Sequence, residues 1–93
     1  MELSIRVVIS GRVQGVGYRA WTVAAASKMQ LKGWVRNRND GSVEAVFNGE
    51  EADVHAMIEA CKEGPPASRV NSIESYAWKE EIEAGPFVAR PTV

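Results

Sequence analysis

A glycine-rich stretch near the N-terminus constrains the fold most strongly, because it separates two segments whose apolar residues recur with different periods. Before it, apolar and polar side chains alternate from Leu3 to Ser10, and this period of two predicts a β-strand. After it, within residues 18–30, a stripe of small and apolar side chains recurs every three or four positions (Thr22, Ala25, Ala26 and Met29), which predicts a helix from Tyr18 to Gln30. Glycine permits the sharp turn between them and lets successive backbone N–H groups point inward, toward the same concave space.

The predicted helix start has the features of an anion-binding site. No Ser, Thr, Asp or Asn stands at the expected N-cap, so the first backbone amides lack the usual side-chain acceptor. This is the positive end of the helix dipole, where a cation such as Arg19 is unfavourable unless an anion lies beside it. A bound phosphate or carboxylate would remove that conflict. The glycine spacing alone fits equally a tight connection with an exposed arginine, since it matches neither the dinucleotide fingerprint nor the P-loop.

The remainder of the chain predicts a second helix and four more strands, the last of them short. Asp40-Gly41 indicates a tight hairpin turn of left-handed residues, and Asn48-Gly49 indicates the end of the third strand. The predicted strands cover residues 34–38, 43–48, 69–76 and 87–90, and the second helix has an apolar stripe of Val54, Met57, Ile58 and Cys61. The final strand lies between two prolines and is therefore expected at an edge of the sheet.

This order of elements, β-α-β-β-α-β with a short fifth strand, predicts an α+β fold of the ferredoxin-like kind. Two helices would pack on one face of an antiparallel sheet. The other face would be wet, with Arg6 and Glu44 on it. A chain of 93 residues without a linker or repeat is expected to form a single domain over residues 1–93.

Composition excludes several classes of function. The net charge of −1 lacks the basic excess expected of a nucleic-acid binder, and no apolar run is long enough to span a membrane. Cys61 is the one cysteine and lies on an apolar stripe, so we expect neither a disulfide nor a nucleophile. His55 has no partner at metal-ligand spacing, so we expect no metal site. Without a signal-peptide pattern, we expect a cytoplasmic protein. We also expect it to be a monomer that acts on a small-molecule substrate and binds neither membrane nor nucleic acid.

Two segments resemble the sequence signatures of the acylphosphatase family. Residues 11–19, GRVQGVGYR, resemble the first signature, with Gly17 and Tyr18 at positions where the family varies. Residues 33–49, GWVRNRNDGSVEAVFNG, resemble the second signature at every defining position. The C-terminal residues 87–93 follow the end of the family pattern only loosely.

The resemblance implies hydrolysis of an acyl phosphate to a carboxylate and inorganic phosphate, without a metal or cofactor. The matched Arg19 would hold the phosphoryl oxygens, and the matched Asn37 would hold the attacking water. The remaining donors would be the loop amides of the substrate-binding residues Gln14, Gly15, Val16, Gly17 and Tyr18.

Other interpretations compete with this one. Arg19 would also suit a surface ion pair, and Asn37 would also suit the start of a hairpin turn. An RNA-recognition module shares the topology but needs aromatic residues on its central strands, where only Phe47 is present, and a metal chaperone needs a Cys-x-x-Cys motif that is absent. A non-catalytic domain that binds an acyl or carbamoyl phosphate through the same loop and Arg19 is the strongest alternative.

Overall fold

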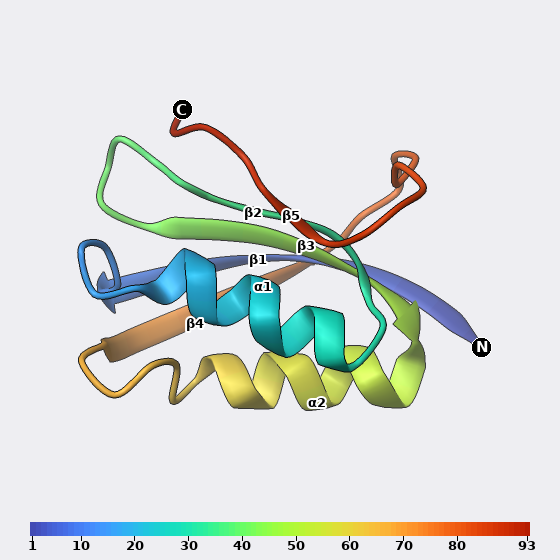
Figure 1. Ribbon diagram of the computed structural model, residues 1–93, viewed down its shortest axis with the longest axis horizontal. Coiled ribbons are helices and arrows are strands. Elements are labelled where there is room, and N and C mark those ends of the chain that lie inside the picture. Colours follow the sequence, from blue (N-terminus) through green and yellow to red (C-terminus); the bar gives the residue numbers. More distant parts are fainter.

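A five-stranded sheet and two helices form two layers in the computed structural model, which describes residues 1–93 (Figure 1). Both helices cover the same face of the sheet, and the strand order is β4-β1-β3-β2-β5. The predicted ferredoxin-like α+β fold is therefore confirmed. Its elements are β1 (Glu2–Arg12), α1 (Tyr18–Lys28), β2 (Lys32–Asn37), β3 (Val43–Glu50), α2 (Glu51–Cys61), β4 (Arg69–Ala77) and β5 (Val88–Ala89). Neither helix has the length and apolarity needed to cross a membrane.

The sheet is mixed, whereas a wholly antiparallel sheet was predicted. Strands β1 to β4 pair antiparallel, but β5 pairs parallel with β2 at the edge. The reason is geometric: β4 runs opposite to β2, so a chain that reverses once after β4 and crosses to the far edge arrives parallel to β2. Phe87, just before β5, is buried and stacks on Phe47 with ring centroids 5.5 Å apart, which fixes the crossing segment to the core.

The core lies between the sheet and the helices, and the predicted periodicities account for it. Alternate residues of the strands and one stripe of each helix are buried there. Of the predicted stripes, Ala25, Met29 and Ile58 are only partly buried. The fully buried members include Val7, Ile9, Thr22, Ala26, Val35, Val43, Ala45, Phe47, Val54, Met57 and Cys61. Each large apolar side chain among them contributes about 1.5–3 kcal/mol to folding.

Three local predictions were wrong. Helix α1 ends at Lys28, because Gln30 adopts the left-handed conformation with φ 59°. Gly49 does not end β3 but pairs with Leu3, and a Cβ there would lie 2.6 Å from a methyl group of Leu31, so this glycine permits close packing. In the hairpin turn only Gly41 is left-handed, with φ 95°. The turn spans residues 38–42 and is closed by the hydrogen bond from Arg38 N to Ser42 O.

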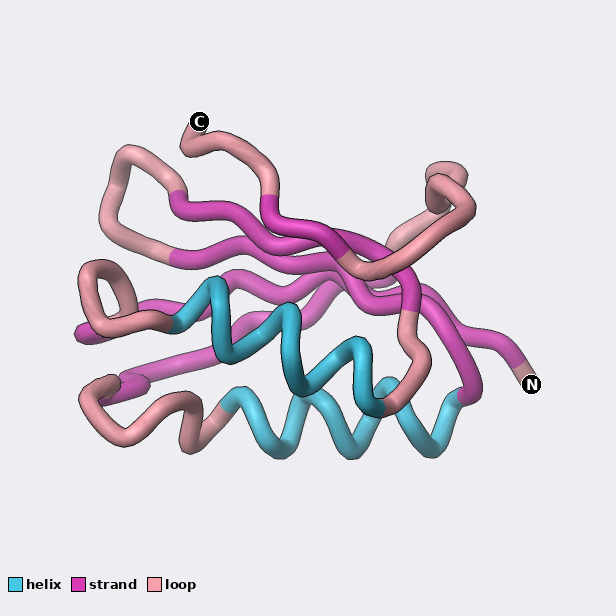
Figure 2. Tube along the Cα trace, viewed as in Figure 1, coloured by secondary structure: helices cyan, strands magenta, loops and turns pink.

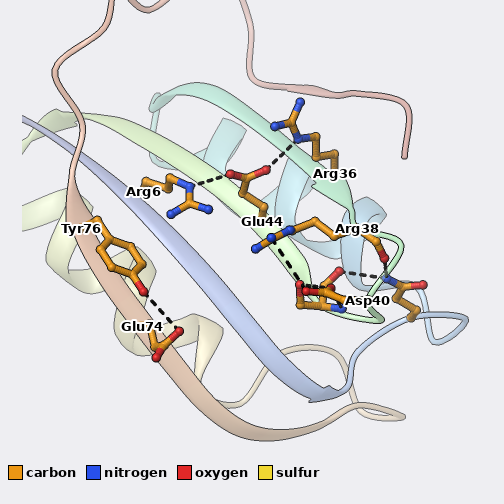
Figure 3. A network of polar contacts seen from close by, with 9 residues as sticks. Arg6, Arg36, Arg38, Asp40, Glu44, Glu74 and Tyr76 are labelled. Carbon is orange, nitrogen blue, oxygen red and sulfur yellow. Dashed lines mark hydrogen bonds and ion pairs between the residues drawn. The ribbon is translucent and has the colours of Figure 1, made fainter. Parts of the chain in front are cut away.

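The face of the sheet away from the helices carries Glu44 between two arginines, as Figure 3 shows. Arg6 Nε donates to Oε2 at 2.5 Å, and Arg36 Nε donates to Oε1 at 2.7 Å. The Glu44 side chain is only 7% exposed, so this face of the sheet, predicted to be in contact with water, is shielded from water at Glu44. Burial alone would raise the pKa of Glu44, but the hydrogen bonds from the two arginines lower it below its usual value.

Candidate functional site

A cavity of about 320 Å³ lies where the glycine loop, the start of α1, the end of β2 and the edge strand β5 meet. Arg19 and Asn37, which come from different parts of the chain, both line it. Of the predicted loop residues, Gly15, Gly17 and Tyr18 line it, whereas Gln14 and Val16 do not. The lining is completed by Val13, Ala20 and Ala89, for which the sequence offered no signal. Figure 2 shows the glycine loop and the β2–β3 turn at the same end of the molecule.

The glycine loop contains backbone donors that have no acceptor within the protein. Gly15 and Gly17 adopt left-handed conformations, with φ 74° and 82°, which favour glycine over residues with a Cβ. Gly17 is the N-cap of α1 and supplies no side-chain hydrogen bond, so the predicted uncapped start is confirmed. None of the backbone N–H groups of residues 14–17 donates to an acceptor of the protein. The first turn of α1 also contains no acidic residue.

Arg19 lies exposed in the first turn of α1 and takes part in none of the six ion pairs of the structure. The alternative role of a surface ion-pair partner therefore finds no support. The guanidinium and the positive end of the helix dipole have the same sign of charge. Together with the loop amides they make this cavity favourable for an anion.

Asn37 is the last residue of β2, and its backbone is held from both sides. It pairs with Val43 of β3, and the N–H of Val93 donates to its carbonyl at 3.2 Å. Its side chain makes no hydrogen bond within the turn, which Asp40 stabilises instead by accepting from the amide and hydroxyl of Ser42 at 2.9 and 2.6 Å. The Asn37 amide group is therefore not engaged in stabilising the hairpin, contrary to the alternative interpretation.

Tyr18 lines the cavity, but its hydroxyl is engaged elsewhere. Its side chain is buried, and its hydroxyl donates to the carbonyl of Cys61 at 2.5 Å, which ties the start of α1 to the end of α2. Burial raises the pKa of Cys61 to about 12, so this thiol stays neutral and is packed, as predicted. Trp21 packs edge-on against Tyr18 at 5.4 Å, which agrees with a packing role.

The Gln14 side chain has a role that sequence reasoning missed. Its Nε2 donates to the carbonyls of Arg38 and Ser42, both at 2.8 Å. These carbonyls lie 24 and 28 residues away along the chain, so no local pattern reports the contact. Elsewhere, no group of three or more His, Cys, Asp and Glu side chains is arranged to hold a metal ion.

Comparison with known families agrees with this geometry. The family model described as acylphosphatase matches residues 5–89, which is most of the chain. The chain belongs to the acylphosphatase family. The resemblance of the two signatures is thereby confirmed.

Individual acylphosphatases and their structures support the assignment. An acylphosphatase of Rhodopseudomonas palustris is 58% identical over 81 residues, which cover 87% of this chain and 82% of the relative. The solved structure of an acylphosphatase from Coxiella burnetii superposes with a TM-score of 0.90 at 36% identity, covering 96% of this chain and 93% of that one. The solved structure of full-length HypF, in its phosphate- and nucleotide-bound form, superposes with a TM-score of 0.87 at 31% identity. The superposed region covers 99% of this chain but only 12% of the HypF chain.

Proposed function

We propose that this member of the acylphosphatase family hydrolyses acyl phosphates to a carboxylate and inorganic phosphate. The observation that carries the proposal is the cavity that unites Arg19 and Asn37 beside backbone amides without acceptors. Arg19 and the loop amides suit a phosphoryl group, and the Asn37 side chain can form hydrogen bonds with a water molecule.

The phosphoryl group would be held by the loop amides of residues 14–18 and by Arg19. A guanidinium presents a planar fork of donors and keeps its proton, which matches the oxygens of a phosphate better than the point charge of a lysine. Phosphoryl transfer passes through a loose transition state whose charge is spread over three equatorial oxygens. Preorganised donors around those oxygens therefore lower the barrier without any covalent step on the protein.

Asn37 would orient the attacking water. Its amide group has an oxygen to accept from water and a nitrogen to donate, so it can fix the direction of attack without acting as a base. The water oxygen bonds to phosphorus while the bond from phosphorus to the acyl oxygen breaks, and its electron pair leaves with the carboxylate. A carboxylate is a weak base and needs no general acid, and a phosphate oxygen takes the proton of the water.

The test compares Asn37→Ala with the matched control Asn39→Ala, which changes an exposed asparagine of the neighbouring turn. Turnover of a simple aryl acyl phosphate is measured in EDTA, with inorganic phosphate as a competitive inhibitor. We expect Asn37→Ala to lower kcat on the order of a hundredfold and to leave inhibition by phosphate within about threefold, because only the positioning of water is lost. A kcat within about threefold of wild type would remove Asn37 from the mechanism.

A non-catalytic phosphate-binding domain is the second candidate, and the match to a small part of HypF favours considering it. Such a domain would use the same amides and Arg19 to bind an acyl or carbamoyl phosphate for another protein. Both functions predict phosphate binding, but only the first predicts turnover. Wild-type protein that binds phosphate yet turns over no faster than Arg19→Ala would establish the second function.

We also propose that residues 1–93 act as one domain and as a monomer in the cytoplasm on small-molecule substrates. A single cluster of 14 buried residues joins both helices to the sheet, which supports the first point. One cooperative unfolding transition and a monomeric mass in sedimentation equilibrium are the expected results.

A further inference from the structure

The glycine loop and the β2–β3 turn are joined by one side chain. Antiparallel pairing of β1 with β3 ends at Ile9 and Val43, and neither residue lines the cavity. Beyond that pair, no backbone hydrogen bond links residues 10–17 to residues 38–42. The two hydrogen bonds from Gln14 Nε2, to the carbonyls of Arg38 and Ser42, are the ones that cross this gap.

The chemistry of this bridge requires an amide. Its two acceptors are backbone carbonyls that also close the turn, where Gly41 N donates to Arg38 O at 3.1 Å and Arg38 N donates to Ser42 O at 2.9 Å. A primary amide has two N–H donors, and both are used here. The carboxylate of a glutamate at this position has only acceptor oxygens, which would face the two carbonyl oxygens without a donor between them. An asparagine side chain would be one methylene group shorter.

We infer that Gln14 is a positioning residue that sets the distance between the phosphate-binding loop and the Asn37 side chain. Gln14 lies within the loop whose amides would bind the phosphoryl group, and its two acceptors are at the two ends of the turn, residues 38–42, that follows Asn37. The inference rests on the proposed function. If the bridge is lost, the loop and Arg19 still form the phosphate cradle. The attacking water is then misplaced relative to phosphorus, so kcat falls while phosphate binding persists.

The first experiment uses Gln14→Met, which keeps the length of the side chain and removes both donors. We expect kcat to fall on the order of tenfold to a hundredfold, with inhibition by phosphate unchanged within about twofold. Gln14→Met is then combined with Asn37→Ala. If Gln14 acts through Asn37, it should cost little further activity in that background, because the two effects are coupled. An equal loss in both backgrounds would show a general structural effect and overturn the inference.

Gln14→Glu provides a second measurement that does not depend on Gln14→Met folding well. A carboxyl group facing two carbonyls in a half-buried position has a raised pKa, and its protonated form regains one O–H donor. We expect its kcat relative to wild type to rise as the pH falls from about 8 to about 5. A flat ratio would overturn the inference.

The outcomes separate this inference from the function on which it rests. If Asn37→Ala is fully active, the proposed mechanism fails. If Asn37→Ala is impaired while Gln14→Met retains wild-type kcat, the mechanism stands and the positioning role of Gln14 is wrong.

Discussion

Replacing Glu44 by glutamine should destabilise the fold through the loss of one buried charge. The carboxylate accepts from Arg6 and Arg36, whose side chains are 25% and 27% exposed, while its own is 7% exposed. The arginines also lie over aromatic rings: Arg6 is 5.2 Å from the ring centroid of Tyr76, and Arg36 is 4.5 Å from that of Trp34. Glu44 therefore joins three strands on the face of the sheet opposite the helices.

The magnitude follows from these contacts. A hydrogen bond to a charged group contributes about 1.5–3 kcal/mol, and breaking a fully buried ion pair costs about 3–5 kcal/mol. Glutamine keeps an acceptor for one arginine and turns its NH₂ group toward the other, and both arginines regain some water. We therefore expect a loss of about 2–3 kcal/mol near neutral pH, where Glu44 is ionised. For 93 residues this corresponds to a fall in Tm of roughly 8–24 °C.

The pH dependence gives an independent check with a defined sign. The pKa of Glu44 in the folded protein lies below its usual value of 4.5. Its contribution to stability is therefore fully present above pH 4.5 and is lost as the pH falls through the lower folded pKa. The difference in unfolding free energy between wild type and Glu44→Gln should shrink accordingly in acid.

Urea unfolding followed by tryptophan fluorescence, at neutral pH and at several acidic values, measures both effects. Glu74→Gln is the matched control, because this exposed carboxylate contacts only the Tyr76 hydroxyl at 3.3 Å. The control should change the unfolding free energy by less than about 0.5 kcal/mol. A loss that small for Glu44→Gln itself, or a loss that persists undiminished in acid, would refute the account of the arginine pair.

Two further predictions concern the start of α1. Tyr18→Phe leaves the carbonyl of Cys61 without its 2.5 Å partner, so the unfolding free energy should fall by about 1–3 kcal/mol; thermal melting checks this, and an unchanged Tm would contradict it. Inorganic phosphate at a hundredfold excess over its Kd should add about 2.7 kcal/mol to wild-type stability and far less to Arg19→Ala. At matched ionic strength, equal phosphate shifts in the two proteins would place Arg19 outside the anion site.

Much of the backbone was predictable from the sequence because the relevant preferences are local. Alternation of side chains predicts which face of a strand meets the helices, so β1 and β3 were recognised from their periods of two, although residues 43–47 of β3 are buried on both faces. The glycines of the loop and the absence of a capping side chain before Tyr18 predicted an uncapped helix start, and both are properties of a few consecutive residues. The roles proposed for Arg19 and Asn37 came from resemblance to a family; the cavity adds that the two residues line one site.

Tertiary structure alone decided the features that depend on residues far apart in the chain. The parallel pairing of β5 follows from which edge the chain reaches after β4, and no residue of β5 encodes it. The burial of Glu44 requires arginines from both neighbouring strands, and the place of Gly49 inside β3 depends on Leu31 packing above it. The bridge from Gln14 joins carbonyls that only the folded turn brings together. A local pattern specifies which conformation a segment prefers, whereas contacts across the sheet form only when distant segments of the chain come together in the folded protein.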